Sequence, residues 1–168
     1  MKTLLLMRHA KSSWKHEELS DHERPLNKRG KKDAPLMGKL ILEKELNPQL
    51  ILSSSAARAR ATVEAIVESV NYRGDVEYLD EFYMAEPAVY LEKLKSLPGD
   101  LERVMIIGHN PGLEGLLQIM SQRVESLPTS AIAYLVFPIQ EWKELKEDSL
   151  GDLIEIWRPG DFREKSKK

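Results

Sequence analysis

Three short, strongly apolar runs stand out in this chain, and each of them stops abruptly at polar or charged residues. Runs of this length are typical of buried β-strands and are far too short to cross a membrane. Helical patterns separate them, which favours an α/β protein: a three-layer α/β/α sandwich with a mostly parallel central sheet. The runs and the polar residues that follow them are 4–7 with Arg8-His9, 49–52 with Ser53 to Arg58, and 104–107 with Gly108-His109.

The rest of the chain supplies further elements between these runs. The segment 11–27 lacks periodicity and predicts a long loop, which in a compact domain is often functional. Leu36 and Leu40 predict a helix that either starts near Asp33 or bends at Pro35. Asn110 is expected to cap a helix whose first residue is Pro111. We also expect helices over 56–70 and from Pro87, and strands over 76–79, 131–137 and 153–157.

Length and charge limit the possible classes of protein. The 168 residues predict one domain over 1–160, followed by a charged tail over 161–168 that we expect to fray. A formal net charge of −2 favours neither nucleic acid nor an anionic membrane as partner. The chain has no cysteine, no signal peptide pattern and no membrane-spanning stretch, which together favour a cytoplasmic protein. The oligomeric state stays open, and a monomer is plausible.

The polar residues after the three runs form the candidate functional site. Carboxyl ends of parallel strands meet at one edge of a sheet, where ligands bind in open α/β folds. We therefore expect Arg8, His9, Arg58 and His109 to converge. Arginine matches phosphate oxygens with a fork of donors, and free N–H groups at helix starts also favour anions. This combination predicts a pocket for a phosphoryl group.

The same residues predict how the pocket acts on phosphate. A histidine between arginines resists protonation because of their like charge, so it is neutral near pH 7 and can attack phosphorus. The second histidine and the arginines would stabilise charge on the transferring oxygens. Because cationic side chains take the part that Mg²⁺ plays elsewhere, we expect neither a metal nor a cofactor.

Several motifs resemble those of the histidine phosphatase superfamily, which has the phosphoglycerate mutase-like fold. Met7-Arg8-His9-Ala10 resembles the Arg-His-Gly signature, with alanine in place of glycine. The segment 53–62 is similar to the second motif, with Ser55 for proline and Ala61 for glutamine, and Gly108-His109-Asn110 is similar to the third. Together with 11–14, 21–26 and 127–129, these segments resemble the small SixA-type phosphohistidine phosphatases.

The resemblance implies a role for particular residues. It makes His9 the phosphorylated nucleophile, and Arg8, Arg58 and His109 the set that binds phosphate. Arg24 and Asn110 become further substrate contacts. Glu81 lies in the interval where larger members carry a proton donor, although a SixA-type enzyme could do without one because an imidazole leaving group needs less help.

The sequence therefore favours a metal-independent phosphatase that forms a phosphohistidine intermediate on His9. A protein domain that carries phosphohistidine is the favoured substrate and partner. A phosphomonoesterase for small molecules and a non-catalytic phosphate-binding module remain as alternatives. A mutase is less favoured because so short a chain shows no insertion to bind a substrate carboxylate.

Overall fold

A computed structural model describes residues 1–163 of the chain. Its centre is a six-stranded sheet in the order β3-β2-β4-β1-β5-β6. The first four strands in this order are parallel, whereas β5 is antiparallel to both β1 and β6. The strands are β1 (Lys2–Arg8), β2 (Leu50–Ser54), β3 (Asp75–Leu79), β4 (Arg103–Gly108), β5 (Ile132–Phe137) and β6 (Asp152–Trp157).

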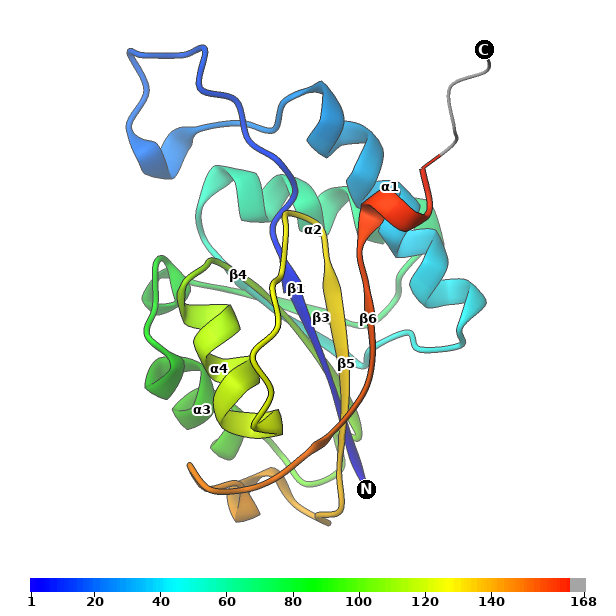
Figure 1. The fold of residues 1–168 in the computed structure, drawn as a ribbon. Coiled ribbons are helices and arrows are strands. Elements are labelled where there is room, and N and C mark those ends of the chain that lie inside the picture. Colours follow the sequence, from blue (N-terminus) through cyan, green and yellow to red (C-terminus); the bar gives the residue numbers. More distant parts are fainter. Residues whose placement is uncertain (164–168) are drawn as a thin grey trace.

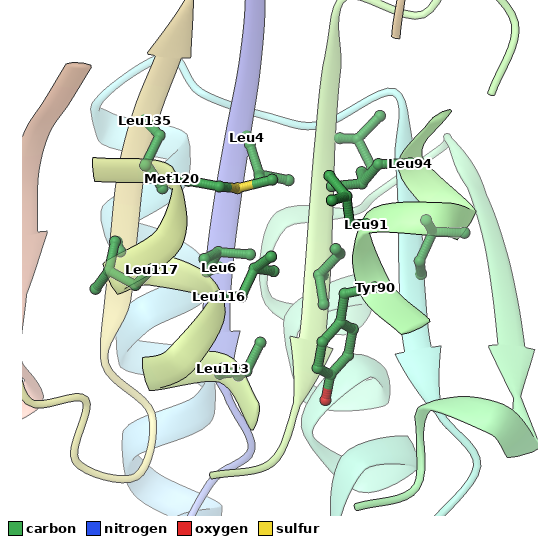
Figure 2. Close-up of a cluster of buried hydrophobic side chains, with 14 of the residues drawn as sticks. Leu4, Leu6, Tyr90, Leu91, Leu94, Leu113, Leu116, Leu117, Met120 and Leu135 are labelled. Carbon is green, nitrogen blue, oxygen red and sulfur yellow. The ribbon is translucent and has the colours of Figure 1, made fainter. Parts of the chain in front are cut away.

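Helices cover both faces of this sheet, as Figure 1 shows. The α-helices are α1 (Lys28–Glu43), α2 (Ala57–Val70), α3 (Pro87–Lys95) and α4 (Gly112–Ser121). In β1, Leu4 and Leu6 face the α3–α4 side, where they pack with the side chains drawn in Figure 2. Leu5 and Met7 face the opposite core, formed with α1 and α2. Both faces of β1 are buried, which explains why the run is apolar throughout. The sheet with helices on both faces confirms the predicted three-layer sandwich.

Of the two alternatives for helix α1, the start near Asp33 is wrong. Its first residue is Lys28 rather than a residue near Asp33, because the Asn27 side chain accepts a hydrogen bond from Gly30 N at 2.9 Å and caps the helix there. The helix continues through Pro35 at the loss of one backbone hydrogen bond. Packing of the apolar stripe that includes Met37 against the sheet offsets that loss.

Helix α4 begins one residue later than expected. Pro111, and not Asn110, is its N-cap, so the predicted cap is wrong by one position. Gly112 opens the helix where a Cβ atom would collide with the Ala85 carbonyl, and only glycine fits that approach. The Asn110 side chain still accepts a hydrogen bond from Glu114 N at 3.3 Å.

The described part of the chain ends against α1. Arg163 donates to both carboxylate oxygens of the buried Asp33, at 3.0 and 2.7 Å. The expectation of a frayed tail over 161–168 therefore does not fit Arg163, and residues 164–168 lie outside the described residues. Within 1–163, no helix combines the length and apolar character that a membrane span requires.

Candidate active site

The carboxyl ends of three neighbouring parallel strands bring the four predicted side chains together. Arg8 pairs with Gly108 in the register of β1 and β4, so His9 and His109 both follow the ends of adjacent strands. Their ring centroids lie 4.9 Å apart. Arg58 comes from the second residue of α2, which follows the neighbouring strand β2. The sheet edge thus assembles a site from segments up to about a hundred residues apart in sequence.

The ring of His9 is fixed by its neighbours. Its Nδ1 lies 2.7 Å from the Ala10 carbonyl oxygen, which can only accept, so we assign the ring proton to Nδ1. Nε2 then carries the lone pair, and Arg58 Nε donates to it at 3.4 Å. The next backbone N–H, that of Ala10, donates to Thr62 Oγ1 at 2.9 Å and ties this turn to α2. The lone pair of the His9 ring is therefore on Nε2.

Both histidines are held neutral. Burial is the largest cause and lowers the pKa of His9 to about 3, with smaller contributions from the charges of His109, Arg58 and Arg8. Burial also lowers the pKa of His109 to about 4, again with help from Arg58. Like charge, the cause that the sequence suggested, is real but secondary to desolvation. Each ring is a neutral imidazole at pH 7.

The orientation of His109 comes from Ser54 and Tyr90. Its Nε2 lies 2.8 Å from Ser54 Oγ, which itself accepts a hydrogen bond from Ala56 N at 3.1 Å. With the serine O–H donating to Nε2, the ring proton falls on Nδ1, which is buried and has no partner among residues 1–163. His109 N donates to the Tyr90 hydroxyl at 3.3 Å, and a Cβ atom on Gly108 would collide with that hydroxyl.

The four predicted side chains line a pocket of about 520 Å³ that is rich in positive charge. Asp21 is the single acidic residue that lines it within the described chain. An excess of guanidinium groups around two neutral imidazoles suits an anion with several oxygens. The full lining is Arg8, His9, Lys11, Ser12, Trp14, Asp21, Arg24, Arg58, Met84, His109, Asn110, Pro128 and Thr129.

Asp21 is a site residue that the sequence reasoning passed over. Arg58 donates through Nη1 to the Asp21 carbonyl oxygen at 2.7 Å and through Nη2 to Oδ2 at 3.1 Å. Arg24 Nε donates to Oδ1 at 3.0 Å, and the Tyr83 hydroxyl also donates to the carboxylate. The hydrogen bond from Tyr83 is the largest cause that holds the pKa of Asp21 well below its usual range, and Arg24 and Arg58 add to it. The Asp-x-x-Arg spacing of 21–24 was the available signal.

Arg24 lines the pocket from the loop 11–27. Its Nη1 donates to Ser12 Oγ at 2.6 Å and to the Ser13 carbonyl at 3.3 Å. Its guanidinium carbon lies 3.5 Å from the centroid of the Trp14 ring, a cation–π contact. Trp14 is itself 76% exposed, so the outer wall of the pocket is an aromatic ring that faces solvent.

Arg8 and Asn110 support the segment 127–129, two residues of which line the pocket. Arg8 Nη1 and Asn110 Nδ2 both donate to the Leu127 carbonyl, at 3.3 and 2.9 Å. Glu114 accepts from Leu127 N at 2.7 Å, and its charge counters the burial that lowers the pKa of Arg8. Asn110 thus lines the pocket with both ends of its amide engaged in holding the chain, and Thr129 follows on the same segment.

Glu81 does not join this group. It is exposed in the short 3-10 helix after β3 and lines a separate surface hollow with Val89 and Lys93. Residues 1–163 also contain no group of three histidine, aspartate or glutamate side chains arranged to hold a metal ion. The pocket's donors are guanidinium and imidazole groups, which are suited to an anion.

Comparisons with known proteins agree with this geometry. The family model described as histidine phosphatase superfamily (branch 1) matches residues 4–83. An uncharacterized chloroplastic protein of Arabidopsis thaliana is 33% identical over 150 residues, which covers 84% of this chain and 69% of that protein.

Solved structures extend the match to nearly the whole chain. A protein of Agrobacterium tumefaciens assigned as the phosphohistidine phosphatase SixA has a TM-score of 0.82 and 31% identity, covering 94% of this chain and 98% of its own. A protein histidine phosphatase SixA complexed with tungstate has the same fold, with a TM-score of 0.81, 22% identity, and coverage of 96% and 99%.

Proposed function

This chain belongs to the histidine phosphatase superfamily and is a phosphatase, and we propose that it hydrolyses phosphohistidine on proteins through a phosphorylated His9. The observation that carries the proposal is the state of His9. Its Nε2 is unprotonated beside the Arg58 guanidinium, and its Nδ1 is anchored on the Ala10 carbonyl. Such a ring is a nucleophile already in its reactive tautomer and orientation.

In the first step, Nε2 of His9 attacks phosphorus in line with the leaving group. The new N–P bond forms as the bond to the substrate breaks, and the electron pair of that bond goes to the leaving imidazole nitrogen. The substrate ring reacts with a proton on its other nitrogen, so it leaves as neutral imidazole. Phosphorylated His9 keeps its proton on Nδ1 and becomes a cation, which the Ala10 carbonyl oxygen stabilises at 2.7 Å. Arg8, Arg58 and the Nδ1–H of His109 are the donors for the equatorial oxygens.

In the second step, water attacks the phosphoryl group on His9. The N–P bond breaks, its electron pair returns to Nε2, and inorganic phosphate leaves with the oxygen of the water. His9 ends as the same neutral tautomer that began the cycle. No group has to move between the two half-reactions, because the same donors face the phosphoryl oxygens in both.

We propose phosphohistidine as the substrate because the pocket, as formed by residues 1–163, holds no carboxyl group that can donate a proton to the leaving group. Asp21 is the single carboxylate in the pocket within residues 1–163, and its depressed pKa leaves it ionised, so it has no proton to give. An alkoxide leaving group needs that proton far more than an imidazole does. The exposed side chains of Trp14 and Met84 line the mouth of the pocket and leave room for a phosphorylated protein surface.

The test compares leaving groups on one enzyme. We would measure kcat/KM for a phosphohistidine protein, for p-nitrophenyl phosphate and for a phosphoserine peptide, and trap the labelled phosphoenzyme in alkali. The expected order is phosphohistidine first, the aryl ester next and the alkyl ester far behind. A label that survives alkali, is lost in acid and is absent from His9→Gln identifies the intermediate.

The rival within the same family is a phosphomonoesterase for small molecules. It predicts that an alkyl phosphomonoester is hydrolysed as fast as phosphohistidine, which would mean that a proton donor reaches the site after all. Turnover without a trapped label on His9 would instead contradict the proposed intermediate. The two results overturn different parts of the proposal.

A further inference from the structure

We propose that Asp21 is a positioning residue that locks the guanidinium groups of Arg58 and Arg24 around the phosphoryl site. The proposal rests on the proposed function for its catalytic consequence. It adds a task for a loop carboxylate that makes no direct contact with either histidine. Asp21 lies in the short 3-10 helix Asp21–Glu23, inside the loop that follows β1.

The contacts of Arg58 are the first argument. Two of its three guanidinium nitrogens donate to Asp21, Nη1 to the main-chain oxygen and Nη2 to the carboxylate. The third, Nε, faces Nε2 of His9 at 3.4 Å. Because the guanidinium group is planar and rigid, holding Nη1 and Nη2 also fixes the direction of Nε. Asp21 therefore determines how Arg58 faces Nε2 of His9 and the phosphoryl group that it receives.

The contacts of Asp21 are the second argument. Its carboxylate receives Arg24 on one oxygen, Arg58 on the other, and the Tyr83 hydroxyl as a third donor. This one side chain therefore joins a loop arginine to a helix arginine that lies 34 positions further along the chain. The Tyr83 ring also lies edge-on to His109, with centroids 5.6 Å apart, so the network reaches the second histidine.

The charge of Asp21 is the third argument, and it opposes binding. A carboxylate that lines an anion pocket repels the phosphoryl oxygens, so a pocket selected for phosphate affinity alone would lack it. The presence of Asp21 therefore indicates a role in orienting the arginines and not in raising the affinity for phosphate. Interactions made in the transition state raise kcat, whereas tight binding of phosphate slows product release. Removing Asp21 should therefore move affinity and turnover in opposite directions.

The experiment measures both quantities on three variants. For Asp21→Asn we expect kcat on the phosphorylated substrate to fall about 10- to 100-fold because Arg58 loses its alignment. Inhibition by inorganic phosphate should set in at about three- to tenfold lower concentration because a negative charge is gone. Tyr83→Phe keeps the charge and removes one hydrogen bond, so kcat should fall about two- to fivefold with no gain in phosphate affinity.

Glu23→Gln is the matched control. It removes an exposed carboxylate from the same 3-10 helix, where Glu23 accepts from Ser20 Oγ at 2.9 Å and does not line the pocket. Both quantities should stay unchanged, and circular dichroism melting should show all variants folded.

Two results would overturn the proposal. Asp21→Asn with unchanged kcat would show that Arg58 needs no such lock. A parallel loss of kcat and phosphate affinity would show that Asp21 only keeps the loop folded. Phosphate binding by calorimetry needs no turnover, so it tests Asp21 even if His9 proves not to be the phosphorylated residue.

Discussion

The two walls of the pocket are built by different kinds of interaction. The buried wall consists of His9, His109 and Arg58. The two histidines follow the ends of β1 and β4, two buried central strands joined by a backbone ladder, and Arg58 lies in the first turn of α2. The other wall is the loop 11–27. Its backbone hydrogen bonds run mostly within the loop itself, such as the one from Ser13 N to the Pro25 carbonyl at 2.8 Å. The side chain of Asp21 ties the loop to Arg58 of α2, and Arg24 donates to Asp21 within the loop.

Because of this difference, the buried wall is suited to holding reacting groups and the loop is suited to recognising the substrate. A ladder of backbone hydrogen bonds holds a side chain within a few tenths of an ångström, which a reacting nucleophile requires. A loop held by side chains can adjust to the group that carries the phosphate. Arg58, which is 3% exposed, and Trp14, which is 76% exposed, illustrate this contrast. Variants on the buried wall should therefore cost the most activity.

The largest effect is expected at His9. His9→Gln removes the proposed nucleophile and should lower kcat about 10⁴-fold or more, because a glutamine side chain cannot form the phosphorylated intermediate. The loss of the alkali-stable phosphoenzyme label checks this directly. His16→Gln is the control, because His16 is an exposed loop residue that faces Glu18 at 3.6 Å. A label that persists in His9→Gln and disappears in His109→Gln would show that His109, at the end of β4, is the phosphorylated residue.

The two arginines compare the walls most sharply. Arg58→Lys keeps the charge but loses the fork that spans Asp21 and His9, so kcat should fall about 100- to 1,000-fold. Arg24→Lys, on the loop, should cost about tenfold and act partly on KM. Arg60→Lys is the control on the same helix as Arg58, because Arg60 stacks on Tyr78 outside the pocket. Equal losses for Arg58 and Arg24 would contradict the distinction between the walls.

The buried wall was also the part that the sequence could predict. The apolar runs of β1 and β4 need burial on both faces, so the hydrophobic pattern alone predicts where these strands end. It thereby also predicts the positions of Arg8, His9 and His109. Asp21 could not be found in this way, because the loop has no period and its partner Arg58 is 37 positions away. The sequence left two alternatives for α1 open, because the pattern alone could not weigh the side-chain cap at Asn27 against the presence of Pro35.

A medium effect is expected from pH. The pKa values of His9 and His109, about 3 and about 4 when folded, lie below the usual 6.5 of the unfolded chain. Between these values the unfolded state binds protons that the folded state does not, so stability falls as pH drops below about 6.5. From pH 7 to pH 5.5, each buried histidine should lower the free energy of unfolding by about 1 kcal/mol.

Urea unfolding at the two pH values measures this loss. His109→Gln should reduce it by about half, because one of the two titrating rings is gone. His16→Gln, which changes an exposed ring, should leave it as it is. An unchanged pH dependence in His109→Gln would mean that burial does not hold this ring neutral. The buried wall would then contain one neutral imidazole instead of two.

The smallest effect is expected at Glu81, which lies on neither wall. Its position in the sequence interval suggested a proton donor, but it lines a hollow with Val89 and Lys93 rather than the pocket of His9. Glu81→Gln should therefore change kcat/KM by less than about twofold for both phosphohistidine and p-nitrophenyl phosphate, as expected of a surface substitution. A loss confined to the substrate with the poorer leaving group would show that Glu81 reaches the site during turnover, and the pocket would then have a third wall that closes over the substrate.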